Sequence, residues 1–262
     1  MKKLALYCKS FYRDVDRVVA LAESIKKHNK DNLPFYVSVP RRDIKLFKSR
    51  GIKNLIEDES VYDGKTSNWI QQQIVKSNFW KLGISENYVC IDSDGYFIRD
   101  FYTSDFMYGE DPYTVIHEQK ELFTWSVHNV ARLGFDPKSG FVADRQKIMD
   151  VFGRTGKYYD FGPVPTIWSS KVWQSLEDNY TQPNNLSWEQ LLQYSPSEFS
   201  WYGEALLAFS AIKLYPSEPL FKVFHYKQQV DDCLSNMITE EMLSQNYLGV
   251  VMQSNFNANL KY

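Results

Sequence analysis

The sequence predicts an α/β protein with a mainly parallel central sheet. In the first half, short apolar runs alternate with stretches in which apolar residues recur at helical spacing. This order of strand and helix is typical of parallel strands joined by right-handed crossovers. The composition, with 44% hydrophobic and 24% charged residues over 262 positions, is that of a folded globular protein and excludes a disordered or fibrous chain.

Each element of the first hundred residues follows from its own pattern. Val15, Val18, Val19, Ala22 and Ile25 recur every three or four residues and mark one face of a helix. The other apolar runs are bounded by Pro, Gly and polar residues, which set their ends. They predict strands at 4–8, 35–39, 52–56 and 88–91, a short helix at 44–47 and a longer helix at 68–82.

Beyond residue 100 the regular pattern fades. Gly and Pro gather at 134–140 and 153–165, so we expect a loop-rich second half within one domain spanning 1–262. The segment Ser187–Gln190 forms a capping box and starts a helix. The remaining expected elements are helices beginning near Ser195 and at 239–245, and an apolar run at 248–252 that returns to the sheet.

Charge and cysteine usage narrow the class of protein. A net charge of −2 gives no attraction to nucleic-acid phosphates, so we expect no nucleic-acid partner. Cys8, Cys90 and Cys233 lie far apart and form neither a disulfide framework nor a zinc-binding spacing. No apolar run approaches the ~20 residues of a membrane span. We expect a cytoplasmic protein and leave peripheral attachment to the inner face of the membrane open.

The acidic pair Asp92-Ser93-Asp94 directly follows the strand predicted at 88–91. Ligands of open α/β sheets bind outside the carboxyl ends of the strands. Two carboxylates in a turn there can bind Mg²⁺ or Mn²⁺, with water and substrate phosphates completing the coordination, which suits a nucleotide diphosphate. The alternative is a solvated turn, because Asp-x-Asp is common by chance. A second copy, Asp14-Val15-Asp16, is explained by its place at a helix start.

Several segments together resemble a little-studied bacterial family of GT-A-type glycosyltransferases whose members occur among polysaccharide-assembly genes. These segments are Lys9–Phe11 with Asp14, Ser24-Ile25, Asn68–Lys76, Tyr88–Asp94, Phe97–Phe101, Ser197–Gly203, Asn246–Val250 and Gln253–Asn255. The resemblance implies a GT-A-like fold in which residues 1–100 bind a nucleotide-sugar donor and 101–262 bind a glycan or lipid-linked saccharide acceptor. It also implies transfer of a sugar in surface polysaccharide synthesis, whether capsule, O-antigen or lipooligosaccharide.

The resemblance assigns nucleotide-sugar and metal contacts. Asp92 and Asp94 would hold Mn²⁺ or Mg²⁺, and GT-A enzymes often add a late histidine as a third ligand, for which His225 is the candidate. The other expected donor contacts are Lys9, Ser10, Gln72, Gln73, Lys76 and Ser93. The alternatives are a polar helix face for the residues at 72–76 and a hydrogen-bonded histidine at a strand end for His225.

The resemblance also points to catalytic and acceptor residues. Glu198 is the first candidate for the base that an inverting transfer needs, with Glu204 and Asp160 as alternatives. A capping box at Ser195–Glu198 explains Glu198 structurally. Trp168, Trp201 and Tyr202 are candidate sugar-stacking residues, and core packing explains them equally well. Inverting and retaining mechanisms both stay open.

Two other functions stay open from the sequence. A nucleotidyltransferase on a similar sheet would use the same carboxylates, although Cys8-Lys9-Ser10-Phe11 lacks the Gly of a phosphate-binding loop. A non-catalytic sugar-binding protein would use the aromatic residues, which make up 16% of the chain, without any metal.

Overall fold

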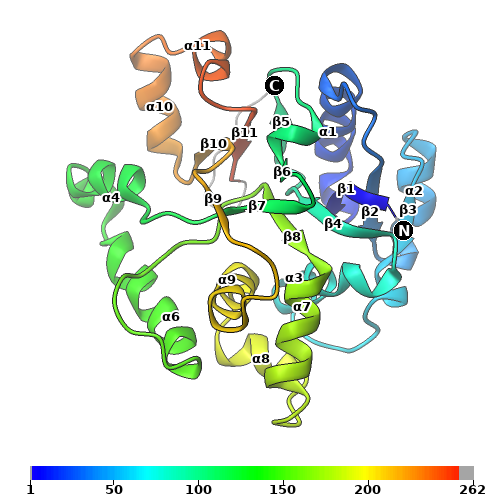
Figure 1. Cartoon of the computed structure of the whole chain (residues 1–262). Helices are drawn as coiled ribbons and strands as arrows, with labels where there is room; N and C mark the ends of the chain where they lie inside the picture. Colours follow the sequence, from blue (N-terminus) through cyan, green and yellow to red (C-terminus); the bar gives the residue numbers. More distant parts are fainter. Residues whose placement is uncertain (1, 254–262) are drawn as a thin grey trace.

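A five-stranded sheet with the order β3-β2-β1-β4-β8 forms the centre of the molecule (Figure 1). The computed structural model describes residues 2–253. The first four strands are parallel, and β8 pairs antiparallel with β4. The strands of this sheet are β1 (Lys2–Lys9), β2 (Phe35–Val39), β3 (Leu55–Glu57), β4 (Ser85–Cys90) and β8 (Thr166–Ser169). The predicted α/β class with a mainly parallel sheet is confirmed.

The parallel strands are joined by the helices that the periodicity predicts. They are α1 (Val15–His28), α2 (Ile44–Ser49) and α3 (Asn68–Asn78). The predicted helix at 68–82 is one α-helix followed by a 3-10 turn at Phe79–Leu82, which ends at Gly83 in the left-handed conformation. Strand β3 begins three residues later than the predicted strand at 52–56, because Ile52 packs into the core ahead of the strand.

The side chains of β1 alternate between two hydrophobic cores. Leu4, Leu6 and Cys8 pack with α1 and α2 on one face of the sheet. Tyr7 points to the opposite face, where its ring stacks on Phe79 with the ring centroids 4.0 Å apart. A parallel strand buried on both faces is therefore apolar at nearly every position, which is why β1 was recognisable in the sequence.

Two smaller sheets lie beside the main one. The strand order is β10-β11-β5 in the first and β6-β7-β9 in the second. The run predicted at 248–252 does form a strand, but it joins β10 and β5 and not the main sheet. The strands are β5 (Gly95–Phe97), β6 (Met107–Tyr108), β7 (Asp111–Val115), β9 (Tyr215–Ser217), β10 (Phe221–Phe224) and β11 (Gly249–Met252).

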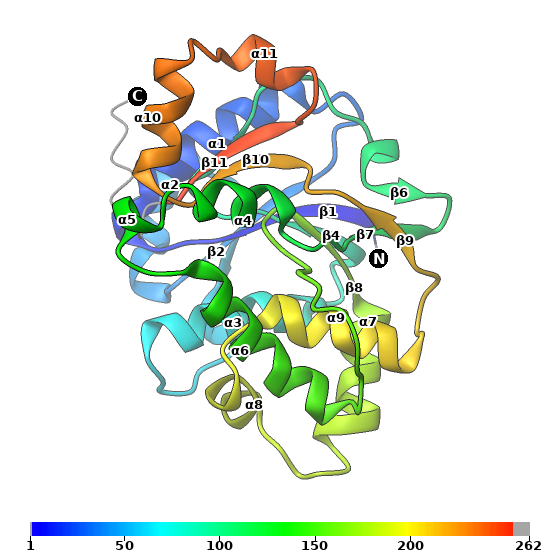
Figure 2. The same cartoon turned by 90° about the vertical axis from the view of Figure 1, so that its left-hand side faces the viewer.

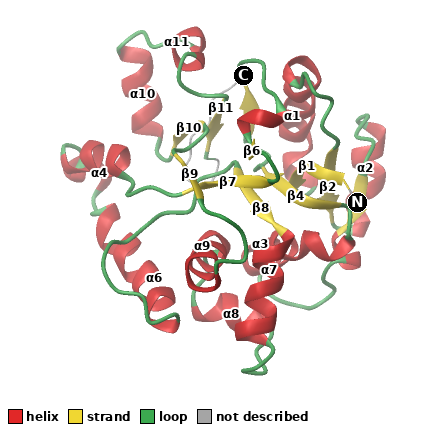
Figure 3. Ribbon diagram, in the orientation of Figure 1, coloured by secondary structure: helices red, strands yellow, loops and turns green. Residues whose placement is uncertain are grey.

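The second half is richer in helices than the sequence indicated. Figure 3 shows the strands in the interior with the helices around them. The helices of this half are α4 (Lys120–Val127), α5 (Val130–Leu133), α6 (Pro137–Val151), α7 (Ser170–Leu176), α8 (Trp188–Tyr194), α9 (Glu198–Phe209), α10 (Lys227–Ser235) and α11 (Glu240–Ser244).

Helix α6 is the clearest correction to the expected loops. Asp136 caps it through a hydrogen bond to Lys138 N, and Pro137 occupies its first turn. It lies at the outside of the molecule (Figure 2), and only Ile148 and Met149 are fully buried, so its apolar pattern is weak. The capping box at Ser187 is confirmed, and the helix expected at 239–245 is α11.

None of the helices formed by residues 2–253 has the length and apolar character needed to cross a membrane.

Gly203 is required by the packing of α9 against Phe161. A Cβ at this position would lie 1.9 Å from Phe161 Cγ, and the Phe161 ring is itself buried. We expect Gly203→Ala to lower the free energy of unfolding by about 1–3 kcal/mol or more, because the overpacked core must shift. Gly140→Ala in α6 is the control: a Cβ there meets no atom within 4 Å. That variant should be neutral or slightly stabilising in urea unfolding. Equal effects of the two changes would contradict the packing assignment.

A candidate ligand-binding cleft at the carboxyl ends of the parallel strands

A cleft of about 660 Å³ opens at the carboxyl ends of the four parallel strands. From β1 the chain proceeds to β2 and β3 on one side and then returns to β4 on the other, so the order reverses between β1 and β4. This reversal is the place where open α/β sheets bind ligands. The loop residues that line the cleft are Lys9–Asp14, Pro40, Arg42, Asp58, Glu59 and Asp92–Asp94.

Helix α3 forms one wall of the cleft. Trp69, Gln72 and Lys76 line it, whereas Gln73 faces the interior and its Oε1 accepts a hydrogen bond from Glu198 N at 3.3 Å. The structure therefore brings Lys9, Ser10, Gln72, Lys76, Asp92, Ser93 and Asp94 together as expected from the sequence. Gln73 holds the start of α9.

A buried ion-pair cluster lies at the base of this wall. Lys76 is 4% exposed, and its Nζ lies 2.5 Å from Asp92 Oδ1 and 3.5 Å from Glu198 Oε1. Burial alone would lower the pKa of Lys76, but the two carboxylates raise it well above its usual value. Lys76 is therefore charged, and it orients Asp92 toward the cleft.

A second buried pair lies at the end of β1. Lys9 Nζ is 2.9 Å from Asp58 Oδ2. Burial raises the pKa of Asp58 to about 6, although Lys9 acts in the opposite direction. The neighbouring Ser10 Oγ is buried and has no hydrogen-bond partner within residues 2–253, so this hydroxyl of the cleft lining is available to a ligand.

Exposed aromatic side chains line the cleft above the buried pairs. Trp69 is 54% exposed, Tyr12 44% and Phe11 37%. Large aromatic faces that stay in contact with water are suited to stacking on a flat ring of a ligand. These residues and Arg42 were not identified from the sequence. Phe11 and Trp69 lie in segments that carry the resemblance, which assigned them no role, and Trp69 is in the first turn of α3, two residues after its N-cap Ser67.

The acidic pair occupies a turn between β4 and β5. Gly95 N donates to Asp92 O, and Met252 N donates to Asp94 O, which fixes the backbone on both sides of Ser93. No group of three or more His, Cys, Asp or Glu placed to hold a metal occurs among the described residues. Two carboxylates on a cleft wall do fit Mg²⁺ or Mn²⁺, because these ions keep water and substrate phosphates as further ligands.

His225 does not line the cleft that contains this pair. It follows β10 and lines a different cavity with His117 and Gln119. Burial lowers the pKa of His225 to about 4, so its imidazole is neutral at neutral pH. The structure does not bring His225 into the cleft as a third ligand.

The three candidate catalytic carboxylates lie outside the cleft lining. Glu198 is 4% exposed behind Lys76, and burial raises its pKa. Helix α9 begins at Glu198 with Ser197 as its N-cap, so the capping box expected from Ser195 is not formed. Glu204 is held by Arg154 through two hydrogen bonds of 2.5 and 2.6 Å. Asp160 contacts Arg145 at 2.8 Å, and its pKa is lowered to about 2 by Arg145 and His117 despite burial.

The three aromatic residues expected to bind the acceptor lie in the core. Trp168, Trp201 and Tyr202 are each 1% exposed. Trp168 packs edge-on against Tyr88 and Trp173, and Tyr202 Oη accepts a hydrogen bond from Ser169 N. Their faces are covered by protein, so core packing explains them and the structure does not support a role in stacking a sugar.

The buried ion pair of Lys76 and Glu198 can be tested by removing first one charge and then both. We expect Lys76→Met to cost about 3–5 kcal/mol at neutral pH, because Glu198 then stays buried without its counter-charge. The double variant Lys76→Met/Glu198→Gln should recover most of that loss in urea unfolding. Lys227→Met, which removes the exposed pair with Asp231, should change stability by less than about 1 kcal/mol. A double variant as unstable as Lys76→Met alone would contradict the assigned ion pair.

The comparisons with known proteins add a family assignment. The model of a family of unknown function, DUF6492, matches residues 4–246. A search of curated proteins finds no match. The matched range contains the main sheet except the first two residues of β1, and it contains the cleft and the helices α1 to α11. The chain therefore belongs to the DUF6492 family, whose function is unknown.

Proposed function

We propose that this protein is a metal-dependent GT-A-type glycosyltransferase that moves a sugar from a nucleotide-sugar donor to a glycan or lipid-linked acceptor in surface polysaccharide synthesis. The observation that carries the proposal is the position of the acidic pair. Asp92 and Asp94 follow β4 at the point where the strand order reverses, in a cleft that also contains Lys76 and exposed aromatic rings. Open α/β sheets bind nucleotide ligands at this point. The location in which it would act is the cytoplasm.

The lining of the cleft matches the parts of a nucleotide-sugar donor. Trp69, Tyr12 and Phe11 offer exposed faces for the base. Arg42 supplies positive charge for the diphosphate, and Ser10 supplies a hydroxyl. The Lys76 ammonium is already compensated by Asp92 and Glu198, so its part is to position Asp92. The cleft volume of about 660 Å³ lies in the range of pockets that enclose a small-molecule ligand.

In this proposal Asp92 and Asp94 hold Mn²⁺ or Mg²⁺. The ion supplies positive charge that stabilises the departing diphosphate. Lys76 orients Asp92 through one ion pair, and Glu198 forms the second ion pair of the Lys76 ammonium. Glu198 is therefore a positioning residue in this structure, because a general base must reach the acceptor hydroxyl within hydrogen-bond distance.

The acidic pair predicts a selective loss of ligand binding. With Mn²⁺ and UDP, GDP, CDP, ADP or dTDP, wild-type protein should gain thermal stability with at least one nucleotide, since ligand bound only to the folded state stabilises by about 2.7 kcal/mol at 100 times Kd. Asp94→Ala should lose the Mn²⁺-dependent part of this gain. Asp16→Ala, in the exposed second copy of the motif, is the matched control and should keep it.

Full Mn²⁺-dependent stabilisation of Asp94→Ala would place the site elsewhere. The released products separate the remaining functions. A glycosyltransferase releases nucleoside diphosphate from its nucleotide sugar, whereas a nucleotidyltransferase transfers the nucleoside monophosphate unit of a nucleoside triphosphate to its acceptor and releases pyrophosphate. Absence of any nucleotide binding by the wild-type protein would favour a sugar-binding protein without this chemistry.

A further inference from the structure

A second cavity of about 480 Å³ lies between the start of α4, the end of β10 and the start of α10. It is separate from the cleft that contains the acidic pair, and the two share no lining residue. The aliphatic, proline and phenylalanine residues of its lining are Ile116, Leu122, Pro163, Pro219, Phe221 and Val223. This cavity contains none of the residues assigned to the nucleotide in the proposed function.

The polar groups of this cavity carry little net charge. Glu118 lies 2.8 Å from Lys157 and 3.6 Å from Lys120. Glu121 is paired with Lys222. Two of the three carboxylates in the lining are thus compensated and the third is Glu218, so the cavity disfavours an anionic ligand. A ligand without charge fits this balance best.

The hydrogen-bonding groups suit hydroxyls. Gln119, Gln229 and His225 line the cavity together with Tyr159 and Tyr247. The neutral imidazole of His225 presents both a donor and an acceptor, as a hydroxyl does. Gln229 Oε1 already accepts from His225 N and Tyr226 N, and Gln119 Nε2 donates to Asp160, so Gln229 offers its amide N–H groups to a ligand and Gln119 offers its Oε1. The two half-exposed tyrosine rings add apolar faces next to these groups. Alternating apolar faces and paired donors and acceptors are the features that a saccharide presents to a protein.

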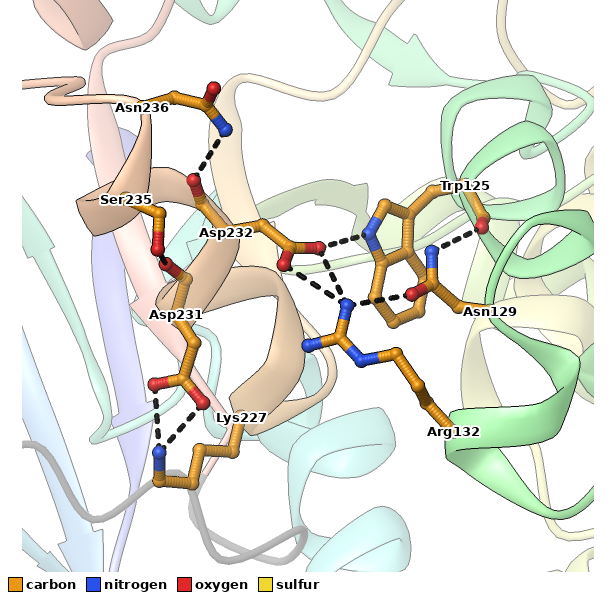
Figure 4. Close-up of polar contacts among 8 residues, drawn as sticks. All are labelled: Trp125, Asn129, Arg132, Lys227, Asp231, Asp232, Ser235 and Asn236. Carbon is orange, nitrogen blue, oxygen red and sulfur yellow. Dashed lines mark hydrogen bonds and ion pairs between the residues drawn. The ribbon is translucent and has the colours of Figure 1, made fainter.

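The walls of the cavity are held in place without a ligand. Figure 4 shows the carboxylate of Asp232, from α10, facing both Trp125 of α4 and Arg132 of α5. Trp125 Nε1 donates to Asp232 at 2.9 Å, and Arg132 Nη1 lies 3.0 and 3.3 Å from its two carboxylate oxygens. The ring of Trp125 also stacks on Tyr226. These contacts join the two helices that flank the opening, so binding requires little reordering of the protein.

The cavity also lies near the acidic pair. Met252 N donates to Asp94 O, and Met252 is opposite Phe224 in the register of β10 and β11. The backbone of Phe224, the residue before His225, is therefore two strand spacings from the backbone of Asp94. This distance is about 10 Å. A saccharide that extends from the cavity along this sheet would have to span that distance to reach a sugar held at the acidic pair.

We propose that the cavity between α4, β10 and α10 binds a neutral saccharide, and that this saccharide is the acceptor. The first part stands on the lining of the cavity alone. The second part rests on the proposed glycosyltransferase function. His225, Tyr159 and Gln119 contact the saccharide, and the α4–α5 segment, fixed to α10 by Asp232, forms one wall of the binding site.

The test measures saccharide and nucleotide binding separately. Saturation-transfer NMR with methyl glycosides of glucose, galactose, mannose and N-acetylglucosamine, at millimolar concentration, reports binding without any nucleotide. We expect at least one glycoside to bind the wild-type protein. Tyr159→Ala and His225→Ala should each weaken that binding about tenfold or more, which corresponds to about 1.4 kcal/mol or more. Tyr108→Ala removes an exposed tyrosine outside both cavities and should bind as the wild type does.

Each result has a defined meaning. Binding that is lost in either cavity variant, with unchanged circular dichroism and unchanged Mn²⁺-nucleotide stabilisation, supports the saccharide site. Failure of every glycoside to bind the wild-type protein, or equal binding by wild type and both cavity variants, overturns it. If the wild-type protein binds no nucleotide, the proposed donor site is overturned. Saccharide binding is then still an independent result.

Discussion

The interaction on which the candidate site depends is the buried ammonium of Lys76 between Asp92 and Glu198. A charge removed from water must be compensated where it lies, so these three side chains fix one another. They belong to α3, to the turn after β4 and to the first turn of α9, which are distant in sequence. Tyr88 Oη donates to Lys76 O at 3.0 Å, and Gln73 accepts from Glu198 N, so the backbones of the same elements are joined as well. Separating these three side chains would leave a buried charge without its counter-charge. The cluster therefore holds the walls of the cleft in place.

The sheet order explains why the cluster lies at a ligand site. Strands β1 and β4 are neighbours in the sheet although β2 and β3 lie between them in the chain. Their carboxyl ends therefore bring Lys9 and Ser10 beside Asp92, and α3 returns along the same edge with Lys76. The second sheet continues from this point, because β5 follows the acidic pair and pairs with β11. The proposed donor cleft contains Asp92–Asp94, and the proposed saccharide cavity is lined by residues of β10, which is separated from β5 by β11 in the second sheet.

The helices and strands of the first half could be predicted because the residues that determine each of them are close together in the sequence. Helical periodicity in α1 and the apolar runs of β1, β2 and β4 are set by which faces are buried, and the acidic pair follows β4 directly in the sequence. The second half depends on distant partners. Glu204 has a structural role only because Arg154 lies beside it in space, and Trp168 is in the core because Tyr88 and Trp173 cover it. Neither partner can be recognised from residue type. The start of α9 was misplaced because Ser195 and Ser197 flank Pro196, and both serines are suitable caps.

The central claim is that the turn after β4 binds a metal ion together with a nucleoside diphosphate. The most direct measurement is a crystal structure with Mn²⁺ and the nucleoside diphosphate that stabilises the protein most, with data collected for the anomalous signal of manganese. We expect an anomalous peak in contact with Asp92 and Asp94, phosphates on the same ion, and the base against Trp69, Tyr12 or Phe11. Manganese or nucleotide bound away from the carboxyl end of β4 would contradict it.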